Sequence, residues 1–296
     1  MLQKHVRNWR SCNKVFHTGS IVEGRIVRLR LQRVILWAQV NIGSGEMRAE
    51  RYIELLVELH AGLPRLGPGC RESTLKALAL CEELPDCPEI LDVGCGTGAQ
   101  TLLLASATQG RVLGVDLYEQ FITQLRTEAE SKGLADRVRG EKADMNALPY
   151  GSNSFDLIWS EGAIYIMGFD NGLAKWRRLL KPGGYLVVTE AVWLRSDPPA
   201  ELRAFWQENY PGMRSVEANL EAAKALGWQP VGNFHLPLTA WLRDYYGPLA
   251  KRIPSFRNAH ADDEDAQQLA DQTEHEMDLT RRYHAYYGYE FFIFRS

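Results

Sequence analysis

The chain has 296 residues, of which 45% are hydrophobic and 24% are charged, and its formal net charge is −3. These values are typical of a globular protein and argue against an intrinsically disordered or fibrous one. The most apolar run, residues 34–38, is far shorter than the roughly 18–20 residues that a membrane-spanning helix needs, so no membrane span is expected.

The five cysteines, at positions 12, 70, 81, 87 and 95, are an odd number and include no Cys-x-x-Cys pair. This pattern argues against a disulfide framework and a zinc site, and it is typical of a protein kept in a reducing compartment. We therefore expect a cytoplasmic protein. The late histidines, at 235, 260, 275 and 284, show no metal-ligand spacing, so no metal site is predicted.

The charge is distributed unevenly along the chain. Residues 1–45 hold eight basic residues and one acid, Glu23, a net +7, so the remaining chain carries −10. A basic, acid-poor N-terminus can be a transit peptide or an arm that binds nucleic acid. It lacks the apolar segment of a secretory signal, and the favoured interpretation is a loosely attached extension to which no function is assigned.

The hydrophobic pattern predicts two helices, at 46–63 and 72–84, followed by alternating strands and helices from residue 89 onward. Such alternation is typical of βαβ units and a parallel sheet. The expected strands are 90–93, 112–115, 137–141, 155–159 and 185–190, with a later strand near 228–235 and a final one at 289–294. The expected helices between them are 99–107, 119–132, 171–180 and a long one at 262–286, whose acidic start and basic end match the helix dipole.

A glycine-rich turn follows the first strand of this alternating region. Asp92 precedes Gly94, Cys95, Gly96 and Gly98, and a helix is expected from residue 99. Glycine tolerates unusual backbone angles and lets a ligand approach the main chain. In open α/β sheets ligands lie at this edge of the sheet, where the strand order reverses.

An acid at the end of the second strand strengthens the prediction of a nucleoside site. Asp116 lies 22 positions after Gly94, and an acid at about this distance binds ribose hydroxyls in Rossmann-type sites. The spacing of Gly94, Gly96 and Ala99 also fits a dinucleotide fingerprint, so an NAD-dependent oxidoreductase stays an alternative. The carboxylate of Asp92 and the absence of a basic residue in the turn count against a pyrophosphate and favour a ligand with a cationic amino group.

The segment 90–101 resembles the first motif of the class I S-adenosylmethionine-dependent methyltransferases. Later segments are similar to that family in order: 140–150 to its third strand, 154–163 to its fourth strand and the loop after it, and 179–184 to the turn before its fifth strand. The likeness covers about a third of the chain, residues 89–190. It fits the small-molecule branch, which includes ubiquinone and menaquinone methyltransferases and related bacterial proteins.

The resemblance implies an α/β fold with a Rossmann-like, seven-stranded, mostly parallel sheet, flanking helices and helical lid additions. It divides the chain into the basic extension 1–45, a helical N-terminal lid at 46–88 and a methyltransferase domain at 89–296 with a helical insertion at about 236–287. The final strand is implied to run antiparallel beside the strand near 228–235.

The resemblance further implies S-adenosyl-L-methionine as the cofactor. In the family an acid such as Asp116 holds the ribose and an apolar neighbour such as Leu117 packs on the adenine. The acid of the third-strand segment binds the adenine amino group, and the residue after it covers the ring. The implied cofactor-binding residues are Asp92, Gly94, Cys95, Gly96, Gly98, Asp116, Leu117, Asp144, Met145, Ser160 and Glu161.

The expected function is methyl transfer to a small-molecule acceptor with release of S-adenosylhomocysteine. Methyl transfer from a sulfonium needs positioning and exclusion of water more than dedicated catalytic groups. The candidate bases are Glu161, Tyr165 and Glu190. For Glu161 a cofactor contact is favoured over proton abstraction, and for the other two packing or capping is favoured. A cofactor-binding scaffold without turnover stays a further alternative.

The acceptor is not identified by the sequence. The nucleic-acid-methylating signature, Asn/Asp-Pro-Pro-Tyr/Phe after the fourth strand, is absent, because residues 160–163 read Ser-Glu-Gly-Ala. We therefore expect no nucleic-acid substrate, and a homodimer stays open. Aromatic residues gather late in the chain, at 241, 245, 246, 283, 286, 287, 289, 291, 292 and 294. They are interpreted mainly as core, with a wall of an acceptor pocket as the alternative.

Overall fold

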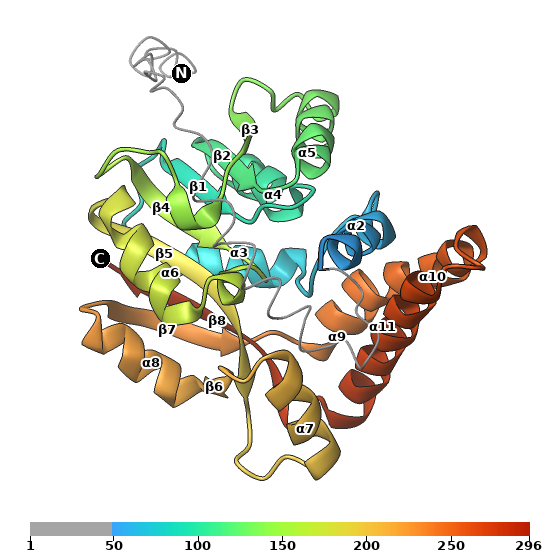
Figure 1. The fold of residues 1–296 in the computed structure, drawn as a ribbon. Helices are drawn as coiled ribbons and strands as arrows, with labels where there is room; N and C mark the ends of the chain where they lie inside the picture. Colours follow the sequence, from blue (N-terminus) through green and yellow to red (C-terminus); the bar gives the residue numbers. More distant parts are fainter. Residues whose placement is uncertain (1–48) are drawn as a thin grey trace, which may run out of the picture.

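The structure, a computed structural model, describes residues 49–296, with side chains from residue 51 onward. The predicted extension 1–45 and the start of the predicted helix 46–63 lie outside the described residues. Within them the chain forms one sheet with helices on both faces (Figure 1). None of the helices within residues 49–296 combines the length and the apolar character needed to cross a membrane.

Seven strands lie in the order β3-β2-β1-β4-β5-β8-β7, and the short strand β6 pairs with the end of β5. Every pair is parallel except the two that β8 makes, because β8 runs antiparallel to both β5 and β7. The strands are β1 (Glu89–Val93), β2 (Arg111–Asp116), β3 (Val138–Lys142), β4 (Phe155–Ser160), β5 (Leu180–Trp193), β6 (Arg214–Ser215), β7 (Gln229–His235) and β8 (Tyr287–Arg295). The predicted seven-stranded, mostly parallel sheet is confirmed, as is the antiparallel last strand.

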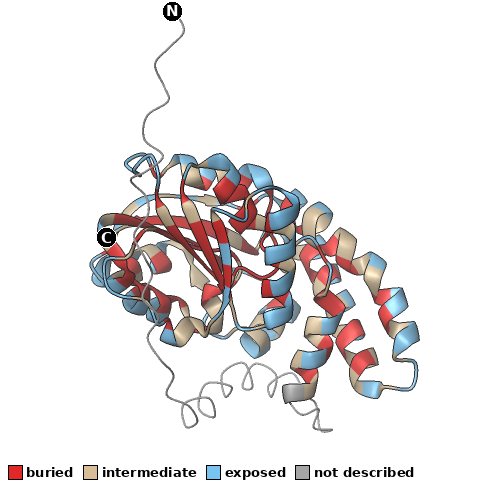
Figure 2. Cartoon of the chain, turned by 90° about the horizontal axis from the view of Figure 1, so that it is seen from above, coloured by how far each residue is buried: buried red, intermediate tan, exposed pale blue. Residues whose placement is uncertain are grey.

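Helices cover the two faces of the sheet in separate groups. Helices α3 (Arg71–Ala79), α4 (Ala99–Ala107) and α5 (Glu119–Ser131) contribute to one hydrophobic core, and α6 (Phe169–Trp176) and α8 (Val216–Ala225) contribute to the other. Figure 2 shows the buried strands between these layers, with exposed residues on the outer sides of the helices. Because both faces are covered, the strands are apolar over most of their length, as parallel strands usually are.

A third group of helices lies beyond one end of the sheet (Figure 1). It consists of α2 (Ala49–His60), α9 (Leu238–Trp241), the π-helical turn η4 (Leu242–Tyr246), α10 (Gly247–Ala259) and α11 (Glu264–Tyr283). Helix α2 packs against α10 and α11, and Arg252 donates a 3.0 Å hydrogen bond to the carbonyl of Glu58. Strand β8 starts just after α11, with Tyr287 level with Trp193 at the end of β5. The group therefore lies beside the carboxyl ends of the parallel strands.

Some predicted boundaries are wrong. Helix α3 ends at Ala79, before the predicted end at residue 84, because the chain turns toward the sheet and Glu83 pairs with Arg295 of β8. Strand β5 begins at Leu180, so residues 180–184 belong to a strand whose pairing with β4 is irregular, and not to a helix end and a turn. Helices α7 (Ala200–Asn209) and α8 were not predicted.

Candidate active site

The glycine turn joins β1 to α4 with three residues in the left-handed region. Gly94, Gly96 and Gly98 have φ angles of +72°, +53° and +91°. A Cβ on Gly98 would overlap the side chain of Leu125, and one on Gly96 would lie 2.8 Å from Leu66. These two glycines are therefore needed by the protein's own packing. Gly94 is the only one of the three that is not buried, so its main chain is the most accessible part of the turn.

Asp92, directly before the turn, is fully buried and tied to α4. Its carboxylate accepts hydrogen bonds from the hydroxyl of Thr101 and, at 3.4 Å, from the amide of Gln100. Burial raises the pKa of Asp92 to about 7, while the bond from Thr101 opposes the rise. These contacts fix the turn against α4. The predicted contact of Asp92 with a cofactor stays a prediction.

Cys95 and Asp116 hold the turn against the end of β2. Cys95 is buried, and its thiol packs against β2: a Cβ added to Gly114 would lie 3.0 Å from the sulfur. Cys95 therefore contributes its main chain, and not its thiol, to the turn. Asp116 accepts hydrogen bonds from the backbone N–H of Gly96 at 3.0 Å and of Tyr118 at 3.1 Å. Burial raises the pKa of Asp116, and these two bonds oppose the rise. Its side chain stays partly exposed at the tip of the strand.

Two further predicted contacts lie next to Asp116. Leu117 is 48% exposed and is the most exposed large hydrophobic residue in the described part of the chain. Asp144 follows β3, where it accepts a 2.8 Å hydrogen bond from the N–H of Asn146 and caps the short helix η1 (Met145–Ala147). Asp144 and Met145 are both partly exposed. The structure thus brings the predicted ribose and adenine contacts to neighbouring strand ends.

Glu161, at the end of β4, is the best-connected acid of the site. Its carboxylate forms an ion pair with Arg65. It also accepts a 2.7 Å hydrogen bond from the hydroxyl of Thr74 and a 2.9 Å hydrogen bond from the indole N–H of Trp159. Its side chain is 2% exposed and that of Arg65 is 12% exposed. The acid therefore joins β4 to the segment before α3. Neither Arg65 nor Thr74 was singled out in the sequence, and both lie more than 80 positions from Glu161.

The connector between α2 and α3, residues 61–70, lies against the glycine turn. Leu66 lies where a side chain on Gly96 would be, and the hydroxyl of Thr97 donates a 3.4 Å hydrogen bond to the carbonyl of Leu63. Together with the ion pair of Arg65, these contacts hold the connector across the ends of β1 and β4.

The other two candidate bases lie on the far side of β4. Glu190 of β5 is 2% exposed, and no hydrogen bond of normal geometry reaches either of its carboxylate oxygens. Burial raises its pKa to about 8, opposed by the nearby hydroxyl of Tyr210 and by Arg214. Tyr165 packs edge-on against Tyr210, with 6.0 Å between the ring centroids. Ser160 is buried and its hydroxyl also lacks a partner. Tyr210 was not predicted.

Glu190 makes the stability of the fold depend on pH. Its pKa is higher in the folded chain than the ordinary value near 4.5, so between pH 4.5 and about 8 the folded state binds a proton that the unfolded state has released. The contribution of Glu190 to stability therefore falls as the pH rises through this window. We expect the free energy of unfolding of Glu190→Gln, relative to that of the wild type, to rise by at least about 2 kcal/mol when the pH is raised from 5 to 8.

Urea unfolding of both proteins at the two pH values measures this gain. The control is Glu290→Gln on β8, opposite Glu190. Burial raises the pKa of Glu290 as well, but the hydrogen bond from Asn233 opposes the rise, so we expect a smaller gain from this substitution. A constant difference between the wild type and Glu190→Gln from pH 5 to pH 8 would contradict the prediction.

Part of the sequence is similar to known proteins. Residues 90–184 match the family model of a methyltransferase domain. Methyltransferase GfsG of Streptomyces halstedii is 37% identical over 105 residues, which are 35% of this chain and only 38% of that relative's length. Over residues 90–184 the chain is therefore similar to methyltransferase domains.

Solved structures extend the likeness in fold to about four fifths of the chain. A SAM-dependent methyltransferase from Geobacter sulfurreducens in complex with S-adenosyl-L-homocysteine has a TM-score of 0.70 at 23% identity, covering 81% of this chain and 97% of that one. The [4+2]-cyclase SpnF has a TM-score of 0.64 at 22% identity, covering 82% and 92%. The fold is that of the class I methyltransferases, and the cyclase indicates that this fold is compatible with more than one reaction.

The strand ends of the methyltransferase domain fit a nucleoside better than a metal. Four residues that are not buried form a row along these strand ends. Gly94 offers its main chain, Asp116 a carboxylate, and Leu117 and Met145 apolar side chains. A flat apolar base and a ribose match such a row in polarity. Among residues 49–296 no group of three or more His, Cys, Asp or Glu side chains could hold a metal ion.

Proposed function

We propose that the protein transfers a methyl group from S-adenosyl-L-methionine to a small molecule and releases S-adenosylhomocysteine. The observation that carries the proposal is the accessible row Gly94, Asp116, Leu117 and Met145 at the ends of three adjacent strands of a methyltransferase domain. The sheet order reverses beside β1, which is the place where open α/β sheets bind their ligands.

Each residue of the row has a role in this proposal. Asp116 accepts hydrogen bonds from the ribose hydroxyls, and Leu117 and Met145 cover the adenine. An exposed leucine is costly in water, so a base that packs on Leu117 contributes roughly 25 cal/mol for each Å² of apolar surface that it covers. Asp144 binds the adenine amino group, and the main chain of Gly94 leaves room for the methionine end. The bound donor supplies an activated methyl group.

The helices before β1 and between β7 and β8 act as a lid in this proposal. The connector 61–70 already contacts the glycine turn, and Arg65 pairs with Glu161 at the end of β4. A cover at this position excludes water, which would otherwise weaken the electrostatic contacts to the donor. It also holds the acceptor in line with the methyl group, which is the main demand of this reaction.

Calorimetric titration separates the proposal from the oxidoreductase alternative. We expect S-adenosylhomocysteine to bind with a micromolar dissociation constant, about −8 kcal/mol, and NAD to give no heat of binding. Asp116→Ala should weaken the binding by about 1–3 kcal/mol, because two charge-assisted hydrogen bonds are lost. The reverse preference, NAD over S-adenosylhomocysteine, would overturn the proposal.

Methyl transfer itself is then measured with a labelled donor and a set of cell metabolites, by the mass of the product. Tight binding of the donor without a methylated product from any metabolite would favour a cofactor-binding scaffold over an enzyme. The test is needed because the fold is shared with the [4+2]-cyclase SpnF.

A further inference from the structure

The guanidinium of Arg65 is nearly buried but only partly bonded. Its side chain is 12% exposed, and its Nη2 atom forms the ion pair with Glu161 at the end of β4. Within residues 51–296, Nη2 is the only nitrogen of this side chain that bonds to a protein oxygen. Neither Nε nor Nη1 belongs to the fully buried polar atoms that lack a partner, so both nitrogens keep contact with solvent. Two nitrogens of one charged group are therefore free to bind an anion.

The protein holds this guanidinium in one place. A Cβ on Gly69 would overlap it, so the connector 61–70 makes room for the charged group by having no side chain there. Its partner Glu161 is itself fixed by hydrogen bonds from Thr74 and Trp159. A guanidinium that is already held in this way loses little conformational freedom when it binds a second acceptor.

The ion pair of Arg65 with Glu161 lies beside the glycine turn. A Cβ on Gly96 would lie 2.8 Å from the residue that follows Arg65. The loop that follows Glu161 contacts the turn at another glycine, because a Cβ on Gly94 would overlap Ala163. The two partners of the pair therefore come from segments that both pack on the turn, which is where the methionine end of the donor is proposed to lie.

The other charges at the turn are negative. Asp92 precedes the turn, Asp116 accepts a hydrogen bond from its main chain, and α4 contains no basic residue. Burial is the main cause of the raised pKa of Asp92; the charge of Glu161 adds to the rise, and the charge of Arg65 opposes it. Both charges of the ion pair therefore reach the start of the turn. Of all these charges, that of Arg65 is the one that attracts a carboxylate.

We propose that Arg65 binds the α-carboxylate of the donor, and that this contact holds the connector 61–70 closed over the glycine turn. The inference rests on the proposed function, because it assigns a further residue and a moving segment to that same donor site. S-adenosyl-L-methionine and S-adenosylhomocysteine both end in an amino acid, which carries one carboxylate and one ammonium group. A guanidinium matches a carboxylate in charge and in planar shape, and hydrogen bonds between such groups are about twice as strong as neutral ones.

This contact makes closure depend on one end of the ligand. Asp116, Leu117 and Met145, the proposed ribose and adenine contacts, lie at the ends of β2 and β3 and do not belong to the connector 61–70. A ligand shifts a conformational equilibrium only by the difference in its affinity for the two states. A ligand without the carboxylate therefore binds to the strand ends without holding the connector, whereas the intact donor does both.

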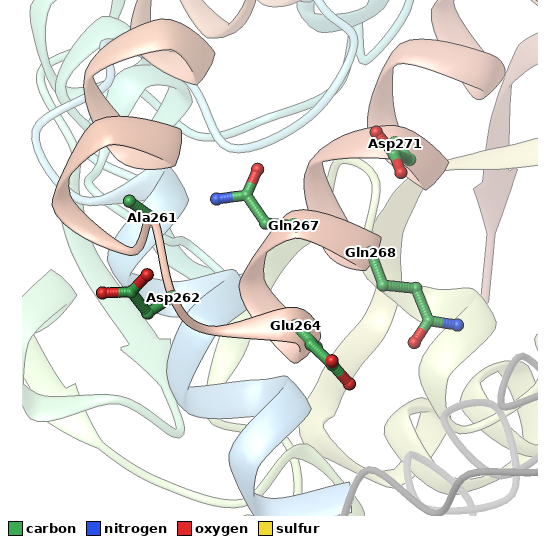
Figure 3. A pocket seen from close by; sticks show the side chains of 6 residues that line it. All are labelled: Ala261, Asp262, Glu264, Gln267, Gln268 and Asp271. Carbon is green, nitrogen blue, oxygen red and sulfur yellow. The ribbon is translucent and has the colours of Figure 1, made fainter.

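A hollow at the start of α11 offers no second site for a carboxylate. It is shallow and is lined by Ala261, Asp262, Glu264, Gln267, Gln268 and Asp271 (Figure 3). Its charged lining residues are all acids, and Arg257 beside it already pairs with Asp271 and Glu274. The hollow therefore repels carboxylates, so a preference for a carboxylate does not arise there.

The test compares three ligands that share adenosine and a 5′-thioether. S-adenosylhomocysteine carries the whole amino acid, decarboxylated S-adenosylhomocysteine keeps its amine alone, and 5′-methylthioadenosine has neither group. We expect the wild type to bind S-adenosylhomocysteine at least about tenfold more tightly than the decarboxylated ligand in calorimetric titrations. Arg65→Gln should abolish this preference and leave the affinity for the other two ligands unchanged.

Two further variants control for charge and for folding. Arg71→Gln removes the same charge from the first residue of α3, which is exposed, and should keep the full preference. Arg65→Gln leaves the buried carboxylate of Glu161 without its ion-pair partner, so a double variant that adds Glu161→Gln is measured beside it. The double variant contains no uncompensated charge at this place, and the preference should be lost in it as well. Binding of 5′-methylthioadenosine checks that each variant is folded.

Hydrogen exchange of the backbone amides within 61–70 measures closure. We expect saturating S-adenosylhomocysteine to slow this exchange in the wild type by about tenfold more than the saturating decarboxylated ligand does, because the carboxylate contact is made only in the closed state. In Arg65→Gln the two ligands should slow the exchange equally.

The outcomes separate the two proposals. If the wild type binds all three ligands equally tightly, the assignment of Arg65 is wrong and the proposed function stands. A preference that survives in Arg65→Gln, or that disappears in Arg71→Gln, also overturns the assignment. A preference that depends on Arg65 without any difference in exchange overturns the closure of the connector 61–70. If none of the three ligands binds the wild type, the proposed function itself fails.

Discussion

Gly94→Ala is expected to weaken the binding of S-adenosylhomocysteine by at least about a hundredfold. The residue has a φ angle of +72°, which costs an L-amino acid about 1–2 kcal/mol. The added methyl group would also overlap the Cβ of Ala163, and overpacking of this kind costs about 1–3 kcal/mol. Ala163 has little freedom to move, because its neighbour Gly162 is hydrogen-bonded to Thr189 of β5. The turn must therefore shift at the place where the donor is proposed to lie.

Gly133→Ala is the matched control for this substitution. Gly133 follows α5 with a φ angle of +65°, and no heavy atom would lie within 4 Å of its added Cβ. Gly133→Ala therefore carries the free-energy cost of a left-handed backbone without any steric overlap of the added methyl group. We expect Gly133→Ala to lose about 1–2 kcal/mol of stability in urea unfolding and to bind S-adenosylhomocysteine as the wild type does. If both variants bind equally well in calorimetric titrations, Gly94 does not shape the donor site.

The parts of the site that the sequence predicted are the local ones. The glycine turn and Asp116 follow directly from strand ends, because parallel strands place their carboxyl ends at one edge of the sheet. Their roles toward a cofactor are still predictions. Asp92 shows the limit of such reasoning, because its carboxylate lies inward against Thr101 and Gln100. Position along a strand gives the face that a side chain occupies, but not the partners that it finds there.

The contacts that the sequence missed join distant segments. Arg65 lies in a stretch rich in glycine and proline, and nothing in that stretch points to Glu161, 96 positions later. The late aromatic residues divide in a similar way. Phe291, Phe292 and Phe294 are completely buried, as the core interpretation predicted. Tyr289 of the same strand keeps accessible surface and contacts the loop after β4. Alternation along a strand cannot distinguish a fully buried position from a partly exposed one.

Glu161→Ala is expected to lower the free energy of unfolding by about 3 kcal/mol. The substitution removes the acceptor of three buried or nearly buried donors, on Arg65, Thr74 and Trp159. Loss of one partner from a buried ion pair leaves the other charge uncompensated, which costs about 3–5 kcal/mol. The side chain of Arg65 keeps 12% exposure, so the lower end of this range applies. Urea unfolding with a linear extrapolation measures the change.

Two further variants show whether the effect belongs to the connector 61–70. Thr74→Val removes one of the three donors and should cost about 1 kcal/mol. Glu201→Ala removes the carboxylate of an exposed ion pair with Arg282, and its unfolding midpoint should hardly change. Because Glu161 anchors the connector, Glu161→Ala should also speed proteolytic cleavage within 61–70 and weaken S-adenosylhomocysteine binding. An unchanged cleavage rate in a destabilised Glu161→Ala protein would show that the connector is held by Leu63 and Leu66 instead.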